Sequence, residues 1–303
     1  MTAKAKPFGR SWTEAVTGSP LLWLLPLVVI LVATFVYPII EIARLSFTNA
    51  GLTGSDYSYT LGSYRRLLGS PYFFDMLKAT VIFVSVSVVF QMFFGFLIAL
   101  VVDQGARRGM RASVVTRTAV LSAWAIPGVI IGIIWSILYQ ESAGGVLNYL
   151  VELTGFGSIP FLSDPAAALA SVTIANIWRG TAFSMILVYA GLQTLPADVL
   201  EAARVDGASA FQHLTRVVLP LLAPILLINL IIVSIDTFNT FDMVLALTGG
   251  GPGRSTEVVA LSIYNQIFQQ FHLGQGTATA VLLLAINAVM TVIYLRLDRE
   301  EVA

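Results

Sequence analysis

Two clusters of hydrogen-bonding side chains interrupt apolar stretches of this chain and could contact a polar solute. Their members recur at helical spacing between 176 and 183 and again between 236 and 240, so several share a helix face. A charge at the centre of a membrane span costs about 2.5–3.5 kcal/mol on insertion scales, so Arg179 and Asp236 should face protein or water. We therefore predict a water-filled pathway lined by groups that recognise hydroxyl-rich solutes. The candidate pathway residues are Asn176, Arg179, Gly180, Phe183, Asp236, Thr237, Asn239 and Thr240.

A structural role is the alternative for the two charged residues. Arg179 and Asp236 could pair with each other or bond to backbone carbonyls, and polar contacts of that kind between membrane helices are common. For Arg179 the two interpretations stay open. For the cluster around Asp236 we favour the pathway, because two threonines accompany it.

Catalytic chemistry lacks its usual residues. The chain has no cysteine, its two histidines are far apart in sequence, and no His/carboxylate cluster has metal-ligand spacing. It also lacks a Gly-rich Lys-Ser/Thr phosphate loop. We expect no catalytic residue, no metal site and no cofactor bound by this chain. A formal net charge of zero also gives no reason to expect a nucleic-acid partner.

Composition places the polar clusters in a membrane protein. Hydrophobic residues make up 57% of the 303 residues and charged residues 11%, less than half the charged fraction of a typical soluble domain. Pro26 and Pro38 lie in the first apolar stretch, which is too long for a cleaved signal peptide. We predict an all-α integral membrane protein with one domain over 1–303 and six transmembrane helices. The expected spans cover about 21–42, 79–102, 118–139, 166–195, 221–241 and 277–295.

Lysine and arginine positions predict the orientation. With the N-terminus inside, 11 of the 17 basic residues fall in the inner segments and five in the outer loops, with Arg179 inside a span. We expect a multi-pass protein of the cytoplasmic membrane with both termini in the cytoplasm. We expect Ser70-Pro71 and Asp164-Pro165 to start helices in the outer loops, and 140–163 to form a turn-rich cover.

A polar insert at 198–220 would then also face the cytoplasm. Asp198 with Glu201, and Ser209 with Gln212, have the spacing of helix-capping boxes. Gly207 lies between them, where a helix that ends in a left-handed residue favours glycine. The pattern predicts a helix, a break and a second helix closed by Pro220. From capping alone, an amphipathic loop helix resting on the membrane surface is the favoured explanation of the insert, because many loops carry such caps.

The insert resembles a known signature, which favours a functional role. Its spacing is similar to the EAA motif of permease subunits from binding-protein-dependent ABC importers, with valine at 217 where that family usually has isoleucine. The matching residues are Glu201, Ala202, Ala203, Gly207, Val217, Leu219 and Pro220.

Much of the rest of the chain resembles the sugar-type branch of this family, found in maltose, oligosaccharide and glycerol-3-phosphate importers. The run 247–252, LTGGGP, is typical of the first of two dissimilar permeases, so the resemblance implies a heterodimer. Similarity to the maltose-type permease implies solute contacts at Gly180, Phe183, Asp236, Thr237 and Thr240. Other matching stretches are Tyr37-Pro38, 46–48, 61–64 and 190–197.

The resemblance also implies a mechanism and partners. A binding protein outside the cytoplasm delivers a di- or oligosaccharide to two permeases, and two ATPase subunits bind ATP and Mg²⁺ and hydrolyse the nucleotide. Glycerol-3-phosphate or a glycerophosphodiester is the alternative solute, and an ion-coupled secondary transporter, a membrane enzyme or a scaffold without a pathway are weaker alternatives. The expected contacts with the ATPase are Glu201, Ala202, Ala203, Asp206, Gly207 and Phe211.

Overall fold

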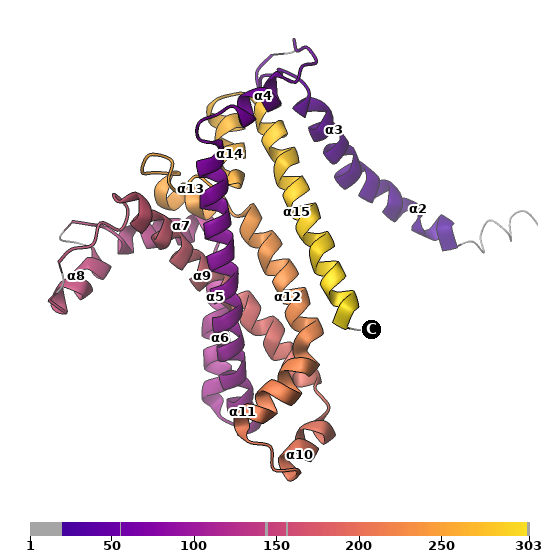
Figure 1. Ribbon diagram of the computed structural model, residues 1–303, viewed down its shortest axis with the longest axis vertical. Coiled ribbons are helices and arrows are strands. Elements are labelled where there is room, and N and C mark those ends of the chain that lie inside the picture. The colour runs from indigo at the N-terminus through magenta and orange to yellow at the C-terminus, as the bar shows by residue number, and fades with distance from the viewer. Residues whose placement is uncertain (1–19, 55, 143–144, 156, 302–303) are drawn as a thin grey trace, which may run out of the picture.

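The computed structural model describes residues 20–54, 56–142, 145–155 and 157–301, and these residues are overwhelmingly helical. Figure 1 shows long helices side by side, with short helices gathered at both ends of the bundle. No strand occurs in this part of the chain apart from an isolated bridge between Thr48 and Tyr59, so the predicted all-α class is confirmed. The helices are α2 (Pro20–Leu31), α3 (Tyr37–Ser46), α4 (Gly62–Leu68), α5 (Phe73–Arg107), α6 (Arg111–Ala125), α7 (Gly128–Leu138), α8 (Val146–Leu153), α9 (Pro165–Thr194), α10 (Ala197–Val205), α11 (Ala210–His213), α12 (Leu219–Asn239), α13 (Asp242–Thr248), α14 (Val259–Tyr264) and α15 (Leu273–Glu301), with π-helical segments at Val32–Val36, Leu214–Val218 and Asn265–Gln269.

Five of the described helical segments are long and apolar enough to cross a membrane by themselves. They correspond to five of the six predicted spans, although most extend beyond the apolar cores seen in the sequence. Their bounds are Trp23–Ser46, Phe73–Arg107, Pro165–Thr194, Ala210–Asn239 and Leu273–Arg296.

The third predicted span is not one helix. Its residues divide between α6 and α7, which meet at an angle of 101°. Pro127 has no N–H to continue the helix, and the residue before it, Ile126, adopts an extended conformation with φ −76° and ψ 130°. The expectation of a continuous helix over 118–139 was therefore wrong, and the pair is long and apolar enough to cross a membrane only when its two helices are taken together.

The connections predicted to lie in the outer loops agree only in part with the predictions from the sequence. Asp164 caps α9 as predicted, since its side chain accepts from the backbone N–H of Ala166 (3.0 Å) and Ala167 (2.8 Å). Ser70 instead accepts from Tyr72 N–H in a turn, and α5 begins later, at Phe73. The predicted turn-rich cover at 140–163 contains a helix, α8, which stands out from the bundle in Figure 1.

Small residues allow α5 and α9 to pack at close range. A side chain at Gly95 would come within 2.6 Å of the Ser184 side chain, and one at Gly180 within 2.3 Å of Gln91. Close backbone approach of this kind is the usual basis of helix association in lipid. Buried apolar side chains form one large cluster, which includes Phe83 and Leu261, and a second cluster, which includes Leu192, Leu200 and Leu222.

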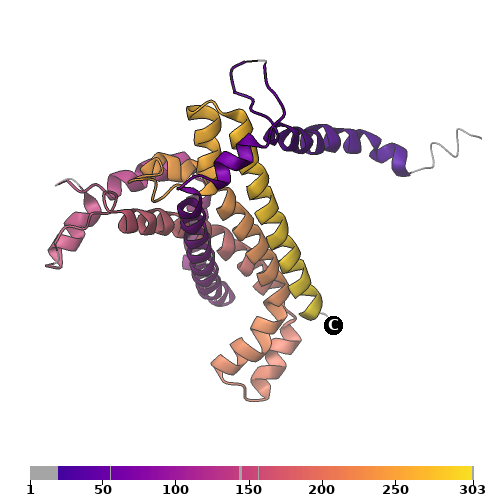
Figure 2. The ribbon, with the colours of Figure 1, turned by 45° about the horizontal axis from the view of Figure 1, so that its top comes forward.

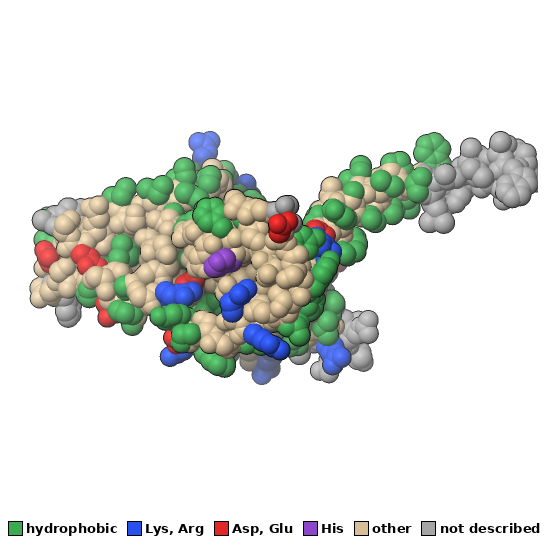
Figure 3. All heavy atoms as spheres, turned by 90° about the horizontal axis from the view of Figure 1, so that it is seen from above, with side chains coloured by type: hydrophobic (Ala, Val, Ile, Leu, Met, Phe, Trp, Pro, Cys, Tyr) green, Lys and Arg blue, Asp and Glu red, His purple; other side chains and the backbone are tan. Residues whose placement is uncertain are grey.

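The first span projects from the bundle. In Figures 1 and 2, α2 extends away from the other helices while α3 runs towards the start of α15. None of the most apolar part of Trp23–Ser46 is buried in this chain, and Figure 3 shows hydrophobic side chains along this arm. The basic residues Lys4, Lys6 and Arg10, which contributed to the predicted orientation, lie outside the described residues.

We predict that Gly132→Leu destabilises the packing of α7 against α13. A Cβ at Gly132 would meet the Met243 carbonyl oxygen at 2.6 Å and the Ala246 methyl at 2.7 Å, so the larger side chain has no room. Overpacking of this kind costs about 1–3 kcal/mol and should lower the Tm of the detergent-purified protein by several degrees. Ile133→Leu, at an exposed neighbour, is the control. Equal Tm values for both variants would contradict the assigned packing.

Candidate coupling segment and solute pathway

The candidate coupling segment, residues 196–218, forms a helical corner at one end of the bundle (Figure 1). Gly207 has φ +78°, the left-handed conformation expected between the two helices. Ser209 caps α11 in the predicted capping box: its hydroxyl accepts from Gln212 N–H (3.3 Å), and its own N–H donates to the Gln212 side chain (2.9 Å). The break and the second cap are therefore confirmed.

The first predicted cap was wrong. Pro196 occupies the N-cap of α10, and Asp198 lies in the first turn without capping it. Pro196 has φ −61° and an extended ψ of 119°, which places the helix start two residues earlier than the Asp198/Glu201 spacing requires. Asp198 can still act through its charge, because a carboxylate in the first turn is favourable to the helix dipole.

Pro220 does not close the second helix as predicted. The chain stays helical from Ala210 to Asn239, and Pro220 lies in the first turn of α12. The π-helical segment Leu214–Val218 directly precedes α12. Because proline cannot donate to the carbonyl four residues before it, this wider turn accommodates Pro220 without ending the helix. The coupling segment is therefore continuous with the fifth span.

The corner exposes apolar side chains. Phe211 is 74% exposed and Val205, which the sequence reasoning missed, is 86% exposed. Glu201, Ala202, Asp206 and Gly207 are also exposed, whereas Ala203 is half-buried. Leu200, only 5% exposed, anchors α10 in the second apolar cluster, with Leu192 and Leu222. Five of the six predicted coupling residues are thus accessible on one rigid corner.

Two predicted pathway residues face α5. The Gln91 side-chain amide donates to the backbone carbonyl of Asn176 (2.9 Å), and Gly180 lies against the same glutamine. Asn176 is 2% exposed, and its side-chain nitrogen has no hydrogen-bond partner. Sequence reasoning missed Gln91, although it is a rare amide in the second span.

Other groups on α9 are more accessible. Phe183 is half-buried, with its ring centroid 5.7 Å from that of Trp124 on α6. Arg179 is also half-buried, and its Nε is buried without a hydrogen-bond partner among the residues that the structure describes. The three ion pairs within the described ranges join Arg44 to Glu41, Arg107 to Asp103 and Arg254 to Glu257, so none joins Arg179 to Asp236.

The polar cluster of α12 is divided between two environments. Asp236 and Asn239 are exposed, whereas Thr237 and Thr240 are 2% and 4% exposed. The Thr240 hydroxyl donates to the Asp236 backbone carbonyl (3.0 Å), and the Asn239 amide donates to the Ile235 carbonyl (2.7 Å). The carboxylate of Asp236 is left available on an open helix face.

The glycine-rich run after the fifth span forms a tight loop between α13 and α14. Gly249, Gly250 and Gly253 have φ of +61°, +92° and +55°. The Arg254 guanidinium lies 4.6 Å from the centroid of the Tyr72 ring, and its ion pair with Glu257 raises the pKa of Arg254. The loop is thereby held against the start of α5.

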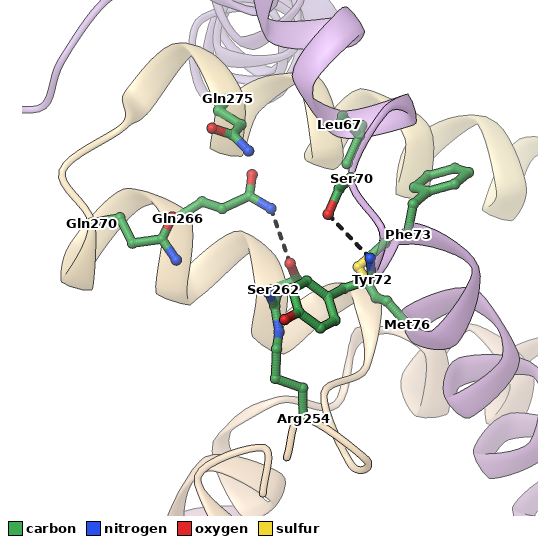
Figure 4. A pocket seen from close by; sticks show the side chains of 10 residues that line it. All are labelled: Leu67, Ser70, Tyr72, Phe73, Met76, Arg254, Ser262, Gln266, Gln270 and Gln275. Atoms are coloured by element: carbon green, nitrogen blue, oxygen red, sulfur yellow. Dashed lines mark hydrogen bonds between the residues drawn. The ribbon is translucent and has the colours of Figure 1, made fainter.

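A small polar pocket lies beside this loop. Figure 4 shows four polar side chains around it. Arg254 comes from this loop, Tyr72 from the start of α5, Gln266 from the π-helical segment Asn265–Gln269 and Gln275 from the start of α15. The Gln266 amide donates to the Ser262 hydroxyl (2.9 Å). Glu141 lies in the separate connection between α7 and α8, and the Leu162 N–H and the Ser163 groups hold its pKa below its usual value. Among the described residues, no group of three or more His, Cys, Asp or Glu side chains could hold a metal ion.

The bundle with its exposed corner has the architecture of a transport permease, and comparison with known proteins identifies the class. Residues 91–301 match the family described as the inner membrane component of binding-protein-dependent transport systems. The chain belongs to this family, and it is a transport permease, not an enzyme. It is therefore a multi-pass membrane protein.

Individual relatives support the assignment. The trehalose/maltose transport system permease protein MalF of Thermococcus litoralis is 35% identical over 240 residues, 79% of each chain. The sn-glycerol-3-phosphate transport system permease protein UgpA of Brucella abortus is 28% identical and covers 93% of this chain and 95% of its own. A chain from the crystal structure of a bacterial alginate ABC transporter has the same fold, with a TM-score of 0.81 over 95% of this chain and 97% of its own at 21% identity.

We predict that Gly207→Pro abolishes coupled uptake while the protein remains inserted in the membrane. Proline requires φ near −65°, which is incompatible with the +78° of Gly207, so the corner must rearrange. Uptake of labelled solute and membrane extraction of the variant are the two measurements. Gly207→Asn is the matched control, because asparagine tolerates the left-handed region, and it should keep most of the uptake. Normal transport by Gly207→Pro would contradict a rigid-corner role.

For the two membrane charges we predict that exchange does not restore function. Arg179→Asp and Asp236→Arg should each impair uptake. The double variant should take up no more solute than the less active single variant, because the two side chains form no ion pair. Uptake and assembly of the three variants are compared in the same membranes. Recovery in the double variant would show that the residues pair during transport.

Proposed function

We propose that this permease forms half of the translocation pathway of an ATP-driven importer for a neutral di- or oligosaccharide. The observation that carries the coupling role is the corner at Gly207, which presents Val205 and Phe211 to solvent on a segment continuous with a membrane span. Apolar side chains so exposed favour a protein partner. The ATPase contacts would be Glu201, Ala202, Ala203, Asp206, Gly207 and Phe211.

The assembly follows from this role. A second, non-identical permease would complete the pathway, a binding protein outside the cytoplasm would deliver the solute, and two ATPase subunits would bind ATP and Mg²⁺. The corner would lie on the cytoplasmic side of the inner membrane, with both termini on the same side. The uncovered face of Trp23–Ser46 is consistent with packing against lipid or the second permease.

The solute-facing groups are those that this chain leaves available. Phe183 could stack on a sugar face, while Arg179, Asp236 and Asn239 could bind hydroxyl groups. Thr237 and Thr240 would support the surface from behind, and Asn176 and Gly180 would hold α9 against α5. A sugar is also what the MalF relative is named for, at 35% identity.

A phosphate-bearing solute is the second candidate, because UgpA is also a relative. Arg179 is the one basic residue among the predicted pathway groups, and Asp236 lies among them with the opposite charge. A phosphate carries about −1.5 to −2 charges at neutral pH and is bound best by several cationic or N–H donors. This charge balance favours a neutral sugar over glycerol-3-phosphate.

The test is uptake in proteoliposomes that contain this chain, its second permease, the ATPase and the binding protein. We expect uptake of labelled trehalose or maltose that requires ATP and survives an uncoupler. Glycerol-3-phosphate under identical conditions is the matched comparison. Preferential uptake of glycerol-3-phosphate would overturn the sugar assignment, and loss of uptake with the uncoupler would indicate ion coupling instead.

A further inference from the structure

A buried carboxylate joins the ends of α5 and α9 next to the coupling segment. Asp103 on α5 is 8% exposed, and its two oxygens accept separate hydrogen bonds. One comes from Arg107 Nε on the same helix (2.7 Å) and the other from the Gln193 side-chain amide on α9 (2.5 Å). A nitrogen of Arg107 also reaches the Leu192 carbonyl at 3.5 Å.

These contacts hold the last turn of α9 in place. A buried carboxylate is stable only if its charge is matched and its oxygens are hydrogen-bonded. Arg107 supplies the charge from within α5, and Gln193 supplies a charge-assisted hydrogen bond from α9. Since Gln193 is 90 positions away in the chain, the contact fixes one helix end against another.

The contact lies where movement of the coupling segment would enter the bundle. α9 ends at Thr194 and α10 begins at Ala197, so only Leu195 and Pro196 separate them. Proline restricts that short connection, and displacement of α10 should therefore pull on the last turn of α9.

A hollow lies beside the contact. It has a volume of about 530 Å³ and lies between the end of α5 and the coupling segment. Asp103 and Arg107 line it from one side and Leu200 and His213 from the other. Within the part of the chain that the structure describes, the polar connection between these elements passes through the end of α9.

We propose that Asp103, Arg107 and Gln193 form an interhelical clamp that transmits movement of the coupling segment to the packed α5–α9 pair. Asp103 and Gln193 are then positioning residues for coupled transport. The inference rests on the proposed function, because it requires the corner at Gly207 to engage an ATPase. A clamp needed only for folding would change the amount of assembled complex but not the solute transported per ATP hydrolysed.

The experiment uses the complete importer in proteoliposomes, with labelled trehalose or maltose as the solute, whichever the wild type takes up. Asp103→Leu and Gln193→Leu each remove the contact, and both together test whether the residues act as a unit. Gln104→Leu is the matched control, since Gln104 is exposed and adjacent on α5. Uptake and ATP hydrolysis are measured per assembled complex.

We expect each clamp variant to reduce uptake about tenfold while ATP hydrolysis stays within about twofold of wild type, as loss of a hydrogen bond to a buried charge would allow. The double variant should be no worse than Asp103→Leu alone, because residues in one contact are not additive. The control should match wild type in both measurements. Asp103→Asn, which keeps an acceptor for Gln193, should assemble normally and show an intermediate loss, so it decides the matter if the leucine variants do not assemble.

Three outcomes would overturn the clamp. If the wild type is active and the clamp variants take up solute at the same rate, the clamp is refuted while the proposed function is not. An unchanged ratio of solute to ATP, with both rates per assembled complex reduced together, would also refute it, because each ATP hydrolysed would still move the same amount of solute. Absence of ATP-dependent uptake in the wild type, whichever sugar is supplied, would refute the proposed function, and the clamp's role would fail with it.

Discussion

The close packing of α5 against α9 is the constraint on which the rest of this structure depends. Lipid offers no hydrophobic driving force between helices, so their association depends on fit and on polar contacts. Gly95 and Gly180 provide the fit, and the Gln91 bond to the Asn176 carbonyl adds a directional contact. Asn229 on α12 donates to Ser184 on α9 (2.7 Å), which fixes a third helix on the same pair.

This packed pair explains how an exposed corner can act as a rigid element. The coupling segment is joined to α9 by two residues and continues without interruption into α12, so both of its ends are tied to helices of the packed group. Leu200 anchors it in the second apolar cluster, and Gly207 supplies the sharp reversal of the chain between α10 and α11. A force on Phe211 or Val205 would therefore be borne by helices and not by a flexible loop.

Features determined by local chemistry could be predicted from the sequence, and features determined by tertiary contact could not. Apolar length located five spans, and the glycine and the Ser209/Gln212 spacing located the corner. The bend at Pro127 was missed because hydropathy counts apolar residues and ignores the missing N–H donor. Gln91 and Asp103 were missed because their roles depend on which face of α9 lies opposite, and helix periodicity cannot supply that register.

The same distinction between local pattern and tertiary contact reduces the number of candidate pathway residues. Spacing grouped eight residues as candidates because it detects a shared helix face but not what that face contacts. Asn176 and Gly180 are engaged with α5, and the two threonines of α12 are buried. Arg179, Phe183, Asp236 and Asn239 remain accessible, and a polar surface in the membrane is stable only beside water or another protein. Since this chain leaves that surface open, the proposed second permease and solute would complete its environment, and selectivity would then be a property of both permeases together.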